Sequence, residues 1–185
     1  MDKKICVFLA DGFEEIEGLT VVDLLRRAGI SVTTVSITGQ LTVRGAHDIY
    51  VQADKLFEET TYEEADMAVL PGGMPGTLNL EKHEGVRTVL KQFYEEKKYI
   101  AAICAAPSIL GKMGMREGRR AASYPSKENE LFGAEVVREP VAVDEFIITS
   151  RGMGTAIDFS LALIEILLDA QKAEEIGTSV IYDRK

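Results

Sequence analysis

The 185-residue chain contains no tryptophan and only two cysteines, Cys6 and Cys104. Two cysteines are too few for the disulfide framework of a small secreted protein, so we expect both thiols to be reduced. No cluster of Cys and His residues has the spacing of metal ligands, which predicts no metal site. The apolar run Ile5–Ala10 is too short for a signal peptide, and no stretch approaches transmembrane length. The expected compartment is therefore the cytoplasm.

Basic residues are also few. The 21 Lys and Arg against 30 Asp and Glu give a net charge of −9, and the basic residues are scattered along the chain. This argues against nucleic acid and membranes as main partners. The composition, 46% hydrophobic and 28% charged, is that of a globular protein long enough to bury a core. We expect a single domain over residues 1–185.

Short apolar segments alternate with segments of helical spacing along the chain. The expected strands are Lys4–Leu9, Ser31–Ser36, Met67–Leu70 and Tyr99–Ile103. The expected helices are Glu14–Ala28, Glu84–Glu96, Ala106–Met113 and Ile157–Leu168. A hairpin is expected from Leu41–Val43 to Ile49–Val51, and a hairpin or a bent strand from Val141–Val143 to Phe146–Thr149. The alternation predicts an α/β fold with a doubly wound, mainly parallel sheet, in which ligands bind beyond the carboxyl ends of the strands.

Cys104 ends an apolar strand and immediately precedes a helix with Pro107 in its first turn. The positive end of a helix dipole favours a thiolate, so we expect this thiol to titrate below an ordinary cysteine. Its small neighbours permit a sharp turn like the nucleophile elbow of other α/β enzymes. The alternative is a buried, inert cysteine, and position alone does not decide between the two. Cys6 lies inside the first strand and is expected to be an unreactive core thiol.

Three glutamates, Glu14, Glu15 and Glu17, lie at the start of the first helix. Carboxylates in this position stabilise a helix through its dipole. Alternatively, one of them points across the strand ends toward Cys104, keeps its proton and donates a hydrogen bond to sulfur. The spacing does not choose among the three.

A second turn, Pro71-Gly72-Gly73-Met74, closes a buried strand. Two glycines allow backbone N–H groups to face a pocket, as an oxyanion hole requires; a tight turn with positive φ is the alternative. Residues 151–155 precede a helix but lack the spacing of known phosphate-binding loops, which favours a turn with a helix cap. His83 is expected at the surface, whereas the exposure of His47, in a turn, stays open.

Five segments together resemble the DJ-1/ThiJ/PfpI superfamily, and its DJ-1/ThiJ branch most closely, over nearly the whole chain. They are ADGFEEIE at 10–17, DLLRRAG at 23–29, LPGG at 70–73, AAICAAP at 101–107 and TSRGMGT at 149–155. Each is moderately specific alone, and five in the family's order are highly specific. The resemblance implies a flavodoxin-like sandwich, of the class I glutamine amidotransferase type. It assigns Cys104 as nucleophile, Glu17 as its protonated partner, and the backbone of Gly72, Gly73 and Ala105 as anion-binding.

The chain departs from the family pattern at several positions. Tyr124 stands where well-studied members of the branch have a histidine before proline, and a phenol is a poor base near neutrality. Ala106 replaces a commonly seen glycine. Ala105 stands where the PfpI protease-like branch has histidine, so peptidase activity is not expected. Amidotransferase activity is not expected either, because no downstream His-x-Glu pair completes a triad. His47 falls where some relatives carry arginine and is a candidate polar group at the pocket.

The resemblance also implies a function without a dissociable cofactor. Cys104 would add to a small reactive carbonyl such as methylglyoxal, and Glu17 would shuttle a proton, yielding lactate or releasing a glycated partner. The alternative is a non-enzymatic redox sensor or chaperone-like protein whose Cys104 oxidises to a sulfinate. In relatives the first helix lies at a twofold interface, so the expected macromolecular partner is a second copy of the chain. The candidate interface residues are Asp23, Arg26 and Arg27.

Overall fold

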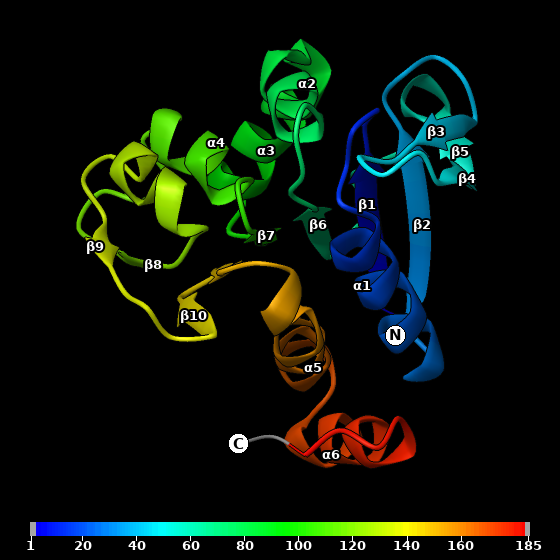
Figure 1. Cartoon of the computed structure of the whole chain (residues 1–185), viewed down its shortest axis with the longest axis vertical. Coiled ribbons are helices and arrows are strands. Elements are labelled where there is room, and N and C mark those ends of the chain that lie inside the picture. The colour runs from blue at the N-terminus through cyan, green and yellow to red at the C-terminus, as the bar shows by residue number, and fades with distance from the viewer. Residues whose placement is uncertain (1–2, 184–185) are drawn as a thin grey trace.

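Seven strands form one central sheet in the computed structural model, which describes residues 3–183 (Figure 1). Their order is β10-β11-β7-β6-β1-β2-β5. The strands are β1 (Lys4–Leu9), β2 (Ser31–Ser36), β5 (Lys55–Leu56), β6 (Met67–Leu70), β7 (Tyr99–Ile103), β10 (Val141–Asp144) and β11 (Ile147–Ser150). Neighbouring strands run parallel except β10 and β11. This confirms the predicted flavodoxin-like, mainly parallel sheet.

The alternation of side chains along β1 divides the core into two layers. Ile5, Val7 and Leu9 point to one side, and Cys6 and Phe8 to the other. The first side is covered by α1 (Glu15–Arg27), α5 (Ala156–Leu167) and α6 (Ala170–Ser179). The second is covered by α2 (Gly76–Lys82), α3 (Glu84–Glu95) and α4 (Pro107–Lys112). Both sides of β1 are buried, which explains why its sequence is a continuous apolar run.

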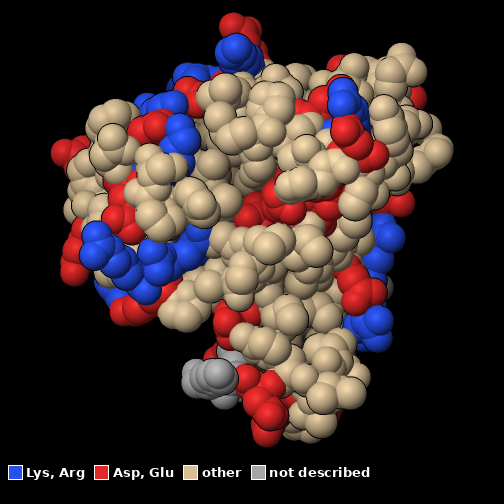
Figure 2. Space-filling view, viewed as in Figure 1, with Lys and Arg blue, Asp and Glu red and all other residues tan. Residues whose placement is uncertain are grey.

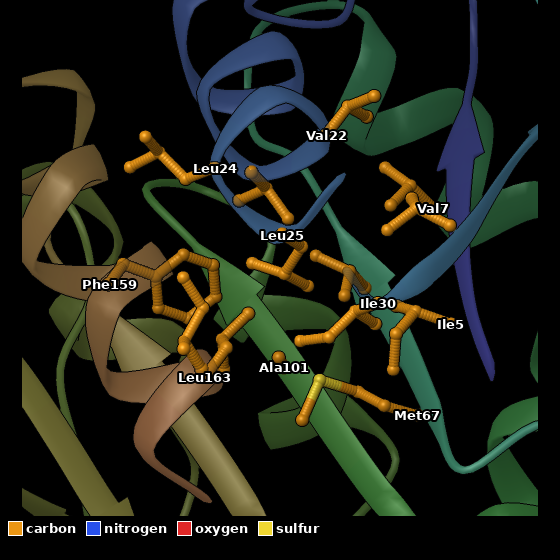
Figure 3. Close-up of a cluster of buried hydrophobic side chains, with 14 of the residues drawn as sticks. Ile5, Val7, Val22, Leu24, Leu25, Ile30, Met67, Ala101, Phe159 and Leu163 are labelled. Atoms are coloured by element: carbon orange, nitrogen blue, oxygen red, sulfur yellow. The ribbon is translucent and has the colours of Figure 1, made fainter. Parts of the chain in front are cut away.

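The layer under α1 and α5 is the larger of the two apolar clusters. Leu25 of α1 and Phe159 and Leu163 of α5 point toward one another over Ile5 and Ala101 of the sheet (Figure 3). All five side chains are fully or almost fully buried. Removing one such large side chain would cost about 2–5 kcal/mol of stability. This rigid layer fixes the position of the first turn of α1, where the candidate glutamates lie.

Smaller elements surround the sheet. They are the antiparallel pair β3 (Thr42–Arg44) and β4 (Tyr50–Gln52), the parallel pair β8 (Arg120–Ala121) and β9 (Glu135–Val136), and three 3-10 turns, η1 (Phe57–Glu59), η2 (Pro125–Glu130) and η3 (Met153–Thr155). Within residues 3–183, the helices are all too short or too polar to cross a bilayer.

Four expected strands agree with the structure residue for residue, and the expected helices agree within two residues at either end. The expected hairpin at β3–β4 is present, and of the two alternatives for β10 and β11 the structure has the hairpin. Helices α2 and α6 and the pair β8–β9 were not predicted. Gly29 follows the last turn of α1 with φ of 82°, as expected of a residue that ends a helix. The polar segment at 151–155 forms η3 and leads into α5, which fits the expected turn.

Candidate active site

Cys104 is the first residue after β7 and adopts a φ of 64°. This left-handed conformation is uncommon for residues other than glycine, so the surrounding structure must hold it. Two hydrogen bonds do so: the Cys104 N–H donates to the Ser150 carbonyl at 3.0 Å, and the Cys104 carbonyl accepts from the Tyr124 N–H at 2.8 Å. Pro107 is the first residue of α4, as predicted. The chain thus makes the sharp strand-to-helix turn of a nucleophile elbow.

The Cys104 sulfur lies among hydrogen-bonding groups from its own turn and from two other segments. The backbone N–H groups of Ala105 and Gly73 donate to it, and the Glu17 side chain is hydrogen-bonded to it. The Gly72 N–H is directed elsewhere, because it donates to Oε2 of Glu17 at 2.9 Å. Of the three backbone groups expected to bind an anion, two face the sulfur and the third positions the carboxyl.

The structure brings Glu17, rather than Glu14 or Glu15, to the cysteine. Glu17 is 1% exposed, and its carboxyl also receives a hydrogen bond from the Met153 backbone. Glu15 is buried as well, but it points to the β3–β4 hairpin and accepts a hydrogen bond of 2.8 Å from the His47 N–H. The choice that the sequence left open among three glutamates is made by this tertiary arrangement.

The Glu17 carboxyl and the Cys104 thiol are coupled acids. Burial raises the pKa of Glu17 to about 7, although hydrogen bonds from Cys104 and from the Gly72 N–H act in the opposite direction. Burial, and then the charge and hydrogen bond of Glu17, raise the pKa of the Cys104 thiol to about 12. The expectation that Cys104 titrates below an ordinary thiol is therefore wrong. Helix α4 has only six residues, and its N-terminus does not offset this burial beside a second acid.

A proton on Glu17 removes the charge of Glu17, one of the causes that raise the pKa of the Cys104 thiol, whereas the effect of burial stays. That arrangement avoids two adjacent negative charges, and it makes the carboxylic acid a donor to the sulfur. The N–H groups of Gly73 and Ala105 lower the pKa of the thiol and add to the same effect. The site therefore places one exchangeable proton between two coupled acids, so that Glu17 can take the proton of the thiol or return it. Cys6, by contrast, is a core residue, and burial raises the pKa of its thiol to about 11.

The two glycines of the β6–α2 turn are required for different reasons. Gly73 has a φ of 92°, which other residues rarely adopt. Gly72 lies so close to the reacting groups that an added Cβ would be 2.6 Å from the Cys104 Cβ and 2.6 Å from Oε2 of Glu17. The expected positive φ thus applies to Gly73, whereas the close approach that excludes a side chain at Gly72 was not predicted.

Tyr124 and His47, the two candidate pocket residues, occupy different places. Tyr124 is 50% exposed, and its backbone N–H contacts Cys104. His47 is exposed and contacts Glu15, with 3.0 Å from Nδ1 to Oε2. A cavity of about 440 Å³ beside His47 is lined by residues of α1 and the hairpin and by Met153, but not by Cys104 or Glu17. His47 is therefore not part of the nucleophile's immediate surroundings.

The three charged residues expected at a dimer interface are paired within the chain. Arg27 donates to Asp23 at 2.7 Å along α1. Arg26 donates to Asp54 at 2.7 Å and to the carbonyl of Val32 at 3.0 Å. The expected contact of Asp23 with a partner's arginine would compete with these bonds.

The backbone N–H of Met153, which donates to the Glu17 carboxyl, was not predicted from the sequence. Its position depends on how the loop after β11 folds back over the sheet.

The fold and the site together define a flavodoxin-like α/β protein with a cysteine at a nucleophile elbow and a buried carboxyl beside it. The chain belongs to the DJ-1/PfpI family, whose model matches residues 3–166.

Individual relatives agree with this assignment. The chain is 36% identical over 182 residues to Protein DJ-1 homolog A of Arabidopsis thaliana, covering 97% of this chain and 46% of that protein. It thus spans about half the length of that relative. It is 29% identical over 187 residues to the glutathione-independent glyoxalase DJ-1 of Schizosaccharomyces pombe, covering 96% and 97% of the two chains. The solved structure of oxidized Toxoplasma gondii DJ-1 has a TM-score of 0.95 at 34% identity, covering 98% of this chain and 100% of that one.

Proposed function

We propose that this protein converts small reactive carbonyls, such as methylglyoxal, through covalent addition to Cys104. The observation that carries the proposal is the hydrogen bond between the Glu17 carboxyl and the Cys104 sulfur, beside the backbone donors of Gly73 and Ala105. A nucleophile, a proton acceptor and donors for a developing oxyanion are the three parts that such chemistry needs. The name of the Schizosaccharomyces pombe relative, a glutathione-independent glyoxalase, supports the same reaction class.

The proposed reaction needs only water as a second reactant. The sulfur of Cys104 attacks the aldehyde carbon, and the carbonyl oxygen takes the proton that Cys104 and Glu17 shared, which gives a hemithioacetal and leaves Glu17 as the carboxylate. Glu17 removes the proton from that carbon and returns it to the adjacent carbonyl carbon, while the hydroxyl proton passes to the oxygen of the former ketone, which leaves a thioester of lactate. Water then hydrolyses the thioester, releasing lactate and restoring the thiol. The same addition to a glycated partner would account for a deglycase-like activity. Reduced thiols are required, which fits a cytoplasmic location.

Lactate production from methylglyoxal tests this proposal. Wild type should form D- or L-lactate, detected with stereospecific lactate dehydrogenases. Cys104→Ser should form none above the uncatalysed rate, and Glu17→Gln should lose most of the activity while its thiol can still be alkylated. Lactate formation by Cys104→Ser at the wild-type rate would exclude the cysteine mechanism. A wild type with no turnover would exclude the glyoxalase function.

A second candidate function, a redox sensor, is favoured by the same donors around the sulfur. Two N–H groups and a carboxylic acid can hold the oxygens of a sulfinate, and a relative of known structure was solved in an oxidized form. Mild peroxide should then add two oxygen atoms to Cys104 and stop there, as mass spectrometry would show. Glu17→Leu should shift the product toward the sulfonate. The same product distribution in both proteins would remove Glu17 from this role.

A further inference from the structure

A second group of chemically active side chains lies outside the Cys104 site. Glu14, Glu15 and His47 each offer one potential ligand atom, and these three atoms lie within 4.8 Å of one another. The His47 Nδ1 is 3.0 Å from Oε2 of Glu15 and 3.6 Å from Oε2 of Glu14. Acidic side chains, drawn red in Figure 2, gather near the middle of this face over the N-terminal end of α1. Two carboxylates and one imidazole thus converge from segments far apart in the sequence.

Glu15 is fixed in a geometry that suits a ligand. Its side chain is almost fully buried, and its Oε1 accepts a hydrogen bond of 2.8 Å from the backbone N–H of His47. A backbone hydrogen bond at Ile49 holds the carboxylate further. These bonds leave Oε2 directed at the imidazole. Ligating carboxylates in metal sites are commonly held by such outer hydrogen bonds, which reduce the freedom lost on binding.

The spacing and the donor types both fit a first-row divalent cation. Ligands at about 2.0–2.2 Å from a tetrahedral zinc ion lie roughly 3.3–3.6 Å from one another. The two distances from Nδ1, 3.0 and 3.6 Å, are close to this range. One nitrogen and two carboxylate oxygens suit Zn²⁺, whereas Mg²⁺ and Ca²⁺ prefer sites made wholly of oxygen.

The three side chains also line one cavity, which gives them a common space for a ligand. Its volume of about 440 Å³ is ample for a water molecule as a fourth ligand, and the same three side chains line it. The rest of its lining is Ile16, Leu19, Thr20, Ile49 and Met153, which offer no competing charged group. The charged groups of the cavity are therefore these three, gathered at one place.

We propose that Glu14, Glu15 and His47 bind one zinc ion per chain through Oε2, Oε2 and Nδ1. The metal takes the place of the proton shared by Nδ1 and Oε2 of Glu15, and any proton on Nδ1 leaves to solvent. Sequence spacing did not predict this site, because His47 lies 32 residues after Glu15 and only the hairpin brings them together. The expectation of no metal site rested on Cys and His spacing alone, which this ligand set does not follow.

Isothermal titration of untagged, EDTA-treated protein with Zn²⁺ tests the site. All titrations use a Cys104→Ser background, so that the thiol does not bind the metal. His47→Arg keeps a hydrogen-bond donor beside Glu15 but offers no free lone pair, and Glu14→Gln removes the second carboxylate. His83→Asn is the matched control, because it removes the other histidine and keeps an acceptor for the Val86 N–H, which His83 Nδ1 accepts.

The expected result is one Zn²⁺ per chain, with affinity at least tenfold lower in His47→Arg and Glu14→Gln and unchanged in His83→Asn. Mg²⁺ at the same concentration should give no binding heat. Circular dichroism of each variant verifies its fold, and two independent variants guard against loss of structure in one. Absence of saturable Zn²⁺ binding, or equal binding in all variants, would show that these residues form only an ion pair and would overturn the proposal.

Discussion

Gly72 contacts Glu17 in two ways: its N–H donates to Oε2 at 2.9 Å, and its Cα has room for no side chain beside that oxygen. An added Cβ would meet Oε2 of Glu17 and the Cβ of Cys104, each at 2.6 Å. Glu17, the proton acceptor, and Cys104, the nucleophile, are therefore both packed against the backbone of Gly72. A substitution at Gly72 should displace both side chains without changing their chemical groups.

Gly72→Ala should consequently lower lactate formation from methylglyoxal by about 10²-fold, as expected when reacting groups move by about 1 Å. Overpacking should also cost about 1–3 kcal/mol of unfolding free energy. Steady-state kinetics and urea unfolding measure the two effects. Gly154→Ala is the control, because no atom lies within 4 Å of an added Cβ there, and it should remain near wild type. Wild-type kinetics in Gly72→Ala would contradict the close approach.

The pKa of Glu17 predicts a pH-dependent effect on stability. Because burial raises this pKa from 4.5 to about 7, the folded state holds the proton more tightly than the unfolded chain. The stabilisation that this proton binding gives is complete below the unfolded pKa of 4.5 and is lost as pH rises through the folded pKa of about 7. Glu17→Gln escapes this loss, so it should be more stable than wild type at pH 8, by up to about 3 kcal/mol. The two proteins should converge near pH 4.

Urea unfolding at several pH values, with EDTA and reductant present, measures this difference. Glu15→Gln provides the opposite case. Burial tends to raise the pKa of Glu15, but hydrogen bonds from His47 and the backbone lower it overall. The ionised Glu15 carboxylate therefore stabilises the fold above the unfolded pKa, and Glu15→Gln should be less stable than wild type at pH 8. A Glu17→Gln protein that is less stable than wild type at pH 8 would show that its carboxylate is not strained by burial.

The sequence predicted those parts of the fold that depend on local pattern. Lys4–Leu9 and Tyr99–Ile103 are short apolar runs buried on both sides, and both were located to the residue. Helix α2 was missed because it follows Pro75 directly and contains Gly76 and Asn79, which are poor helix formers. Helix α6 buries little beyond Ala173 and Ile176, so it lacks a clear apolar stripe.

The candidate site was predictable in its members but not in their energetics. Cys104 at a strand-to-helix junction is visible in the sequence, and the family resemblance selected Glu17. The high pKa of the thiol was not visible, because it arises from burial and from a carboxyl 87 residues away in the chain. The contact between His47 and Glu15 was missed for the same reason: it depends on how the β3–β4 hairpin rests on the start of α1.

We expect a homodimer, formed by the apolar surface around the start of α1 rather than by Asp23. Ile16, Ile49 and Met153 are each more than half exposed and line one cavity, which is unusual for side chains of this size. Light scattering at micromolar concentration should give twice the chain mass. Ile16→Lys should shift the protein toward monomers, whereas Phe132→Lys, at another exposed apolar residue, should not. A wild type that is monomeric at this concentration would refute the expectation.

Tyr124 is the main departure from the better-studied members of the family, and its position allows a direct test. Its N–H holds the Cys104 carbonyl at 2.8 Å through the backbone, so a change of side chain leaves that bond in place. An added Cβ at Gly152 would lie 3.6 Å from the Tyr124 ring, which places the ring at the loop after β11. If a base at this position moves protons, its absence costs part of the ~10²–10⁴-fold that such transfer contributes. Tyr124→His should then raise methylglyoxal turnover about tenfold, with alkylation of Cys104 unchanged.

If the phenol of Tyr124 instead orients a substrate oxygen, Tyr124→Phe should raise KM and lower turnover. Equal kinetics in wild type and both variants, with loss of turnover only in Glu17→Gln, would show that position 124 takes no part in the reaction.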